Sequence, residues 1–175
     1  KDGKFEVKID TTMKTIEVEF RDGQPFPFKR YIYIPSQLKD FDVQFFPEGG
    51  NLLSGNFQQV AFKAIGADGR AVEATGEVYQ DSVVIATVRT QHDGMGKFRL
   101  PVNPGKKFYA VMKTEDGVEK RFDLPEVSET GWGLSVSRKD SILSYRVIKG
   151  ENAILPEELY TVVHCRGIVV GMNRV

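Results

Sequence analysis

Hydrophobic and polar residues alternate with a period of two along most of this chain, as in Phe5-Glu6-Val7-Lys8-Ile9. Successive side chains of a β-strand point to opposite faces of a sheet, so this alternation indicates strands with one buried face. No long window places apolar residues at helical spacing. The pattern therefore predicts an all-β protein.

The middle of the chain carries the most regular pattern. Turn-forming groups such as Asp68-Gly69, Asn103-Pro104-Gly105 and Asp116-Gly117 separate successive alternating segments. Short strands with turn signals every eight to twelve residues are typical of an immunoglobulin-like or fibronectin-like sandwich. We therefore predict one complete seven-stranded β-sandwich over residues 41–124. Its strand candidates are 42–46, 57–65, 72–79, 83–90, 96–101, 107–114 and 118–124.

Both flanks of this segment contain further strand candidates. Residues 5–9 and 16–20 form a predicted hairpin, a third strand covers 31–34, Pro35 ends it, and 36–40 is a predicted linker. Four more candidates follow at 132–138, 142–149, 158–165 and 168–172, with a loop at 152–156. Residues 1–40 and 125–175 are thus strands of flanking sandwiches. They belong either to two different neighbours or to one discontinuous domain, and exposed apolar faces favour packing of the flanks together.

Charge and hydropathy narrow the class of protein. Lys plus Arg equals Asp plus Glu at 24 each, so no net field attracts the chain to nucleic acid. No run of about twenty apolar residues is present that would span a membrane directly. Because the sequence opens at Lys1 on a strand-like pattern, we expect it to be a piece of a longer protein that carries its localisation signal elsewhere.

Four segments carry a resemblance to a known family. They are Asp42-Val-Gln-Phe-Phe-Pro-Glu-Gly-Gly-Asn-Leu-Leu-Ser-Gly, Val60-Ala-Phe-Lys-Ala, His92-Asp-Gly-Met-Gly-Lys-Phe and Pro104-Gly-Lys-Lys-Phe-Tyr-Ala. They resemble the macroglobulin-like domains of large Bacteroidetes cell-envelope proteins, some of which also carry carboxypeptidase-regulatory-like or TonB-receptor plug-like regions. The segment from Glu158 to Gly167 resembles the domain that follows in that family. Together the resemblance covers about residues 40 to 175.

The resemblance implies a structural or binding unit at the periplasm, outer membrane or cell surface of a bacterium. Its implied partners are other domains of the same longer chain, with a surface protein or a glycan as further candidates, and it implies no catalysis. A thioester-bearing macroglobulin would need a Cys-x-Glu-Gln run, whereas Cys165 is followed by Arg166-Gly167-Ile168. The resemblance therefore predicts no covalent trap.

Two pairs of residues could suggest catalysis. His92-Asp93 has the composition of a general base with its orienting carboxylate, but the following Gly94 favours a tight turn. His164-Cys165 lies in an alternating strand, whose adjacent residues point to opposite faces and so cannot form a nucleophilic pair. We expect Cys165 to be a small buried hydrophobe. We therefore predict no enzyme and no catalytic residue.

The sequence also contains no convincing metal, phosphate or sugar site. Two histidines and one cysteine are too few for a typical zinc site, and Asp40, Asp42 and Glu48 are better explained as solvated strand-end acids than as calcium ligands. Glu48-Gly49-Gly50 is expected to be a structural bend, since no helix follows to complete a phosphate-binding loop. Trp132 favours packing between domains over an exposed sugar platform. We predict no cofactor and no metal.

Two hypotheses of function remain beside each other. The first is a non-catalytic structural or binding module of a cell-envelope protein. The alternative is a carbohydrate- or peptide-binding adhesin domain, suggested by twelve Phe, six Tyr and one Trp, or an accessory domain of an outer-membrane transporter or a macroglobulin-type protease inhibitor. Sandwich folds host many unrelated functions, so a site is needed to choose between them.

Overall fold

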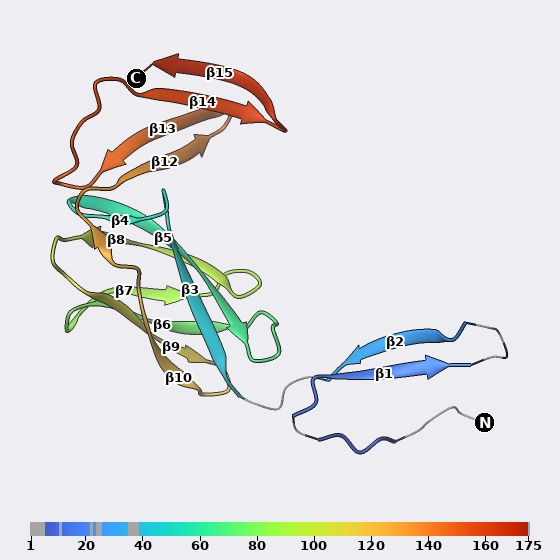
Figure 1. Ribbon diagram of the computed structural model, residues 1–175. Helices are drawn as coiled ribbons and strands as arrows, with labels where there is room; N and C mark the ends of the chain where they lie inside the picture. Colours follow the sequence, from blue (N-terminus) through green and yellow to red (C-terminus); the bar gives the residue numbers. More distant parts are fainter. Residues whose placement is uncertain (1–5, 11, 22, 24–25, 35–38, 175) are drawn as a thin grey trace. The chain divides into compact units, whose positions relative to one another are not determined.

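The computed structural model describes residues 6–10, 12–21, 23, 26–34 and 39–174 (Figure 1). These residues form strands, turns and loops, which confirms the all-β prediction. None of them lies in a helix that is long and apolar enough to cross a membrane. The strands are β1 Thr15–Phe20, β2 Phe28–Tyr33, β3 Phe41–Pro47, β4 Leu52–Leu53, β5 Asn56–Gly66, β6 Ala74–Gln80, β7 Val83–Arg89, β8 Met95–Val102, β9 Phe108–Thr114, β10 Glu119–Asp123, β11 Val127–Ser128, β12 Trp132–Lys139, β13 Ile142–Lys149, β14 Tyr160–Cys165 and β15 Ile168–Arg174.

The chain divides into two compact units, which we describe separately. The first contains Lys1–Phe46, Gln59–Leu100 and Lys107–Leu124, and the second contains Pro47–Gln58, Pro101–Lys106 and Pro125–Val175. The division does not follow the order of the sequence. Three segments from different parts of the chain meet in each unit.

The N-terminal hairpin differs from the predicted one. β1 pairs antiparallel with β2, with Ile16 opposite Ile32 and Phe20 opposite Phe28. The predicted partner strand over 5–9 is wrong for its described residues, because 6–9 adopt no strand. Alternation alone states that a segment has two faces, but it does not say which of two equally spaced segments supplies the partner. Phe5 and the predicted linker residues 35–38 lie outside the described residues.

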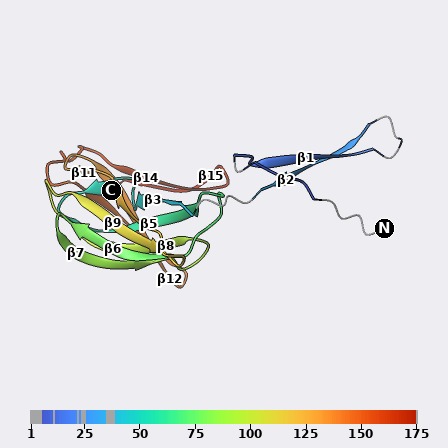
Figure 2. The same ribbon diagram turned by 90° about the horizontal axis from the view of Figure 1, so that it is seen from below.

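Two sheets build most of the first unit. β10-β9-β6-β7 form a four-stranded sheet whose neighbours run antiparallel, and β3-β5-β8 form a three-stranded sheet (Figure 2). The two layers meet at the Phe41 and Phe122 rings, whose centroids lie 5.3 Å apart. Within the three-stranded sheet, Phe45, Phe62 and Phe98 pack edge to face or tilted against one another, at centroid separations of 6.2–6.3 Å. This interdigitation of aromatic rings is the usual way in which two sheets bury their inner faces.

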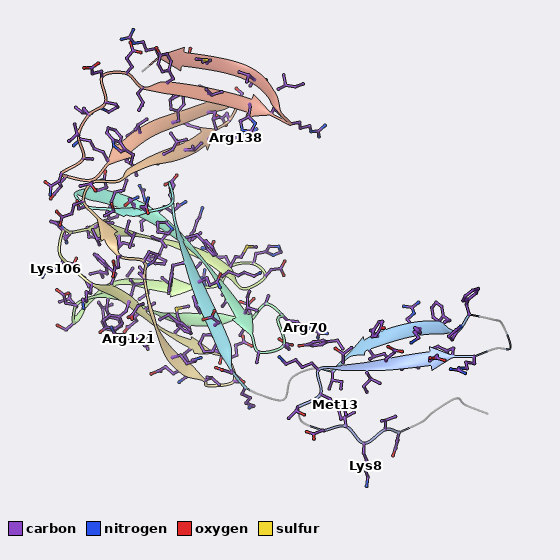
Figure 3. All side chains as sticks on the ribbon, in the orientation of Figure 1. Lys8, Met13, Arg70, Lys106, Arg121 and Arg138 are labelled. Carbon is purple, nitrogen blue, oxygen red and sulfur yellow. The ribbon has the colours of Figure 1, made fainter. Side chains whose placement is uncertain are left out.

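The predicted strands of the central segment are confirmed to within a few residues at each end. Turn residues with positive φ lie between them, including Asp81, Asp93 and Gly117, as the Asp- and Gly-rich separators predict. On the outer face of the four-stranded sheet, Tyr79 and Tyr109 stack at 4.9 Å. The guanidinium of Arg121, labelled in Figure 3, lies 3.7 Å from the centre of the Tyr109 ring.

The second unit is built from two-stranded pieces. β12 pairs with β13, β14 pairs with β15, and β11 pairs in parallel with β4. Leu52 and Leu53 on β4 are fully buried, and Ile148 on β13 is also buried. β4 and β11 were not predicted, because a bridge of two residues is too short to show any periodicity. The other four strands match their predicted positions.

Candidate binding surface

The loop after β3 approaches the backbone of β12 very closely. A Cβ atom on Gly49 would lie 2.7 Å from the Leu134 nitrogen and 2.9 Å from the Gly133 Cα, and Gly49 has a φ of +87°. The carboxylate of Glu48 accepts a hydrogen bond of 2.9 Å from the Val136 backbone nitrogen. Only glycine fits at position 49, since it lacks the Cβ and tolerates the left-handed backbone. The predicted structural bend is thus also a docking contact onto β12.

Buried amide side chains hold this loop in shape. Gln58 is almost fully buried; its carbonyl oxygen accepts from the Leu53 nitrogen at 2.5 Å, and its amide nitrogen donates to the carbonyls of Glu48 and Asn51. The Asn56 amide nitrogen donates to the Lys149 carbonyl at 2.7 Å. These bonds give backbone groups of the loop side-chain partners and connect the loop to β13. The loop and the β12–β13 hairpin are therefore one rigid platform.

An apolar groove of about 650 Å³ lies on this platform, between the inner face of the β12–β13 hairpin and β14. Its volume is within the range of sites that bind small molecules or side chains. The lining side chains from the platform are Trp132, Leu134, Val136, Leu143, Tyr145 and Val147, and those from the opposite wall run from Leu159 to His164. The Tyr145 hydroxyl and the Thr161 hydroxyl meet at 3.0 Å across the groove.

The groove remains open although it is apolar. Leu143 is 57% exposed and Val162 is 52% exposed. In the described part of the chain, β12–β13 and β14–β15 are separate two-stranded sheets, with no backbone ladder between them. Two strands with an uncovered apolar face are marginally stable, whereas a larger sheet or a packed partner completes them. The groove is therefore an exposed surface whose side chains are of the kind that usually form a protein core.

Among the described residues, few titratable side chains line the groove. His164 is the one titratable side chain that lines it besides the hydroxyls of Tyr145 and Tyr160. The pKa of the Tyr160 hydroxyl is raised because it donates to the Glu158 carboxylate, at 2.8 Å. The Tyr160 hydroxyl is thus a hydrogen-bond donor whose acceptor is the Glu158 carboxylate.

The two pairs considered for catalysis are placed differently by the structure. His92 and Asp93 contact each other at 3.1 Å on the surface, where Asp93 and Gly94 turn the backbone through positive φ. This geometry is that of the predicted tight turn. The prediction that Cys165 is buried is wrong: it is exposed, because it lies beside the turn that joins β14 to β15. Cys165 pairs with Ile168 at the end of that hairpin.

Two of the acidic residues considered as calcium ligands have hydrogen-bond partners of their own. Asp40 accepts a hydrogen bond of 2.9 Å from the Lys120 ammonium, and this bond lowers the pKa of the Asp40 carboxyl. The Glu48 carboxylate accepts a hydrogen bond from the Val136 nitrogen of β12. Within the described ranges, no group of three or more His, Cys, Asp or Glu side chains is arranged to hold a metal ion. Trp132, singled out for packing, is half-buried in the wall of the groove.

The groove itself was not predicted. Two of its walls, at residues 132–136 and 143–147, alternate regularly in sequence, and that signal was available as apolar side chains on one face of each strand. Residues 160–164 do not alternate strictly, because Val162 and Val163 are adjacent. The sequence does not show that the apolar faces of these strands leave an open groove between them.

No family model, curated protein or solved structure matches the chain.

Proposed function

We propose that this chain is a non-catalytic binding module of a larger bacterial cell-envelope protein, and that it acts through domain–domain or protein–protein surfaces. The sandwich is of the immunoglobulin-like, macroglobulin-like type, as the resemblance around Phe45-Phe46-Pro47-Glu48-Gly49-Gly50 implies. The observation that carries the proposal is the open apolar groove beside β12. An open surface lined mostly by apolar side chains supports an interaction site.

The groove favours a polypeptide in extended conformation over a sugar. Its walls are strands lined by apolar side chains, and an extended peptide presents apolar side chains at a period of two that can pack against them. On the other unit, Tyr109 is half-buried; its ring stacks on Tyr79, and the Arg121 guanidinium lies 3.7 Å from its centre. Sugar platforms need a free aromatic face. The glycan-binding alternative therefore has less support than the peptide-binding one.

A designed strand peptide tests this proposal. The probe is a fluorescent peptide of about twelve residues with Val and Thr alternating and Lys at both ends, titrated by fluorescence anisotropy. We expect binding by the wild-type chain, at least tenfold weaker binding by Leu143→Asp in the groove, and unchanged binding by Thr87→Asp. Leu143 and Thr87 are both exposed strand residues, which makes them a matched pair.

Two outcomes would count against the proposal. Absence of binding at millimolar peptide, or equal loss of affinity in both variants, would mean that the groove is not the binding surface. A glycan array that gives binders whose affinity is insensitive to Leu143→Asp would favour the adhesin alternative.

A further inference from the structure

The β12–β13 hairpin has two backbone edges, and the loop after β3 closes one of them. The Glu48 carboxylate accepts a hydrogen bond of 2.9 Å from the Val136 nitrogen. A Cβ on Gly49 would lie 2.7 Å from the Leu134 nitrogen, so the loop lies against the outer edge of β12. A free strand edge pairs readily with another strand, and a loop that covers the edge prevents this pairing. The outer edge of β12 is therefore protected.

The outer edge of β13 has no such cover. Among the residues that the structure describes, β13 pairs with β12 alone. The Tyr145 hydroxyl meets the Thr161 hydroxyl at 3.0 Å, so β14 contacts a side chain of β13 without pairing with its backbone. Residues 142–146 of β13 are exposed. The backbone of this segment is therefore open to a further strand.

The hydrogen bonds of the hairpin show which residues of β13 direct their backbone groups to the outer edge. Opposite residues of an antiparallel pair alternate between pairs that exchange hydrogen bonds and pairs that do not. Val136 lies opposite Tyr145, and its nitrogen donates to Glu48 and not to β13. The bond from the Gly150 nitrogen to the Gly131 carbonyl, an odd number of positions along the hairpin, gives the same assignment. The N–H and C=O groups of Tyr145 therefore point away from β12, to the outer edge.

The residues that face this edge with their backbone also line the groove with their side chains. Backbone direction and side-chain direction both alternate along a strand, so Leu143 and Val147 share the backbone direction of Tyr145. The side chains of these three residues line the groove. Directly opposite residues of two paired strands share one face of the sheet. An antiparallel strand that bonds to this edge would therefore place the side chains of its bonded residues over the groove.

The other face of β13 carries a positive charge. Arg146 is exposed and, as a neighbour of Tyr145 in the strand, points to the face away from the groove. In the part of the chain that the structure describes, no acidic side chain forms an ion pair with it. A residue of an added strand directly opposite Arg146 would have its Cβ about 4.5–5.5 Å from the Arg146 Cβ. A carboxylate at that position would complement the charge.

We propose that an extended segment of another polypeptide adds to the outer edge of β13 as an antiparallel strand, with apolar residues at alternate positions over the groove and an acidic residue between them beside Arg146. The proposal rests on the function proposed above, since it specifies how the groove binds its peptide. In this mode of recognition, main-chain hydrogen bonds supply affinity and alternate side chains supply specificity. The added strand extends the hairpin to three strands, the number at which a sheet with a hydrophobic face becomes stable.

Backbone N-methylation of the designed Val/Thr peptide tests the strand addition. In an antiparallel strand, the Val residues over the groove direct their N–H groups to β13, and the Thr N–H groups point away. N-methylation of two central Val residues should therefore weaken binding about tenfold or more in fluorescence anisotropy, as the loss of two hydrogen bonds requires. N-methylation of two central Thr residues is the matched control and should leave the affinity within about twofold of the unmodified peptide.

A charge swap tests the place of the acidic residue. Two further peptides carry Glu or Lys in place of one central Thr. The wild-type chain should bind the Glu peptide about two- to fivefold more tightly than the Lys peptide, as an exposed ion pair allows. Arg146→Glu should reverse this preference. Lys139→Glu should retain it, because Lys139 is exposed on the same face of the hairpin but belongs to β12, the strand farther from the added one.

The outcomes separate this binding mode from the proposed function. N-methylation that weakens both classes of peptide equally, or neither, or only the peptide methylated at Thr, would overturn the strand addition. A preference for Glu that persists in Arg146→Glu would overturn the place of the acidic residue. An unmodified peptide whose binding depends on Leu143 but not on N-methylation would refute this mode alone, whereas absence of binding by every peptide would refute the proposed function too.

Discussion

The contact between Gly49 and β12 leads to a quantitative prediction. In Gly49→Ala the new methyl group would lie 2.7 Å from the Leu134 nitrogen, at a backbone φ of +87°. A non-glycine residue in that conformation costs about 1–2 kcal/mol, and forced overpacking costs about 1–3 kcal/mol more. The neighbour is backbone and cannot rotate away. We therefore expect a loss of about 2–5 kcal/mol in the stability of the second unit.

Gly50→Ala is the matched control. Gly50 has a φ of +94°, but a Cβ there meets no atom within 4 Å. This variant should lose only the conformational part of the stability, about 1–2 kcal/mol. The difference between the two variants isolates the contact with β12.

Urea unfolding followed by tryptophan fluorescence measures both variants. Trp132 is the single tryptophan and opens β12, next to Gly133 in the contact. It therefore reports on the unit in which the loop docks. Midpoints for Gly49→Ala and Gly50→Ala that agree within about 0.5 kcal/mol, after conversion with the denaturant slope, would refute the docking of the loop on β12.

Three further predictions concern single interactions. Glu48→Ala removes the acceptor of the Val136 nitrogen and should cost about 1 kcal/mol in the same unfolding assay, while Glu48→Gln, which keeps an acceptor oxygen, should cost less. Lys120 lowers the pKa of Asp40 from its ordinary 3.8, so the contribution of this pair is present above pH 3.8 and is lost as the pH falls through the folded value. In Lys120→Met the Asp40 pKa, followed by NMR, should rise, and an unchanged value would contradict the pairing. Phe62→Ala leaves a cavity among Phe45 and Phe98 and should cost about 3–5 kcal/mol, measured by circular dichroism, whereas a cost below 1 kcal/mol would contradict a packed core.

The strands were predictable because each central strand buries one face against the other layer. Phe62, Phe98 and Met112 alternate with exposed residues, and all three are buried. The turns were predictable for a separate reason, since Asp and Gly occupy the positions with positive φ. These local signals decide element type and position.

The failures have a common physical cause. Cys165 alternates like a core residue, yet it is exposed beside the turn between β14 and β15. Residues 6–9 alternate like a strand but find no partner among the described strands. Alternation states which face is apolar and not what covers it. Gly49 was predicted only to form a bend. The neighbouring residues do not show that β12, over 80 residues later in the chain, approaches this glycine.

Hydrogen exchange of the chain with and without the designed strand peptide tests the central claim most directly. We expect saturating peptide to slow exchange of the backbone amides over residues 132–147 and 159–164, which form the walls of the groove. The amides of β6 and β7, on the first unit, should be unaffected. Protection confined to β6 and β7, or bound peptide that protects neither region, would contradict the assignment of the groove as the binding surface.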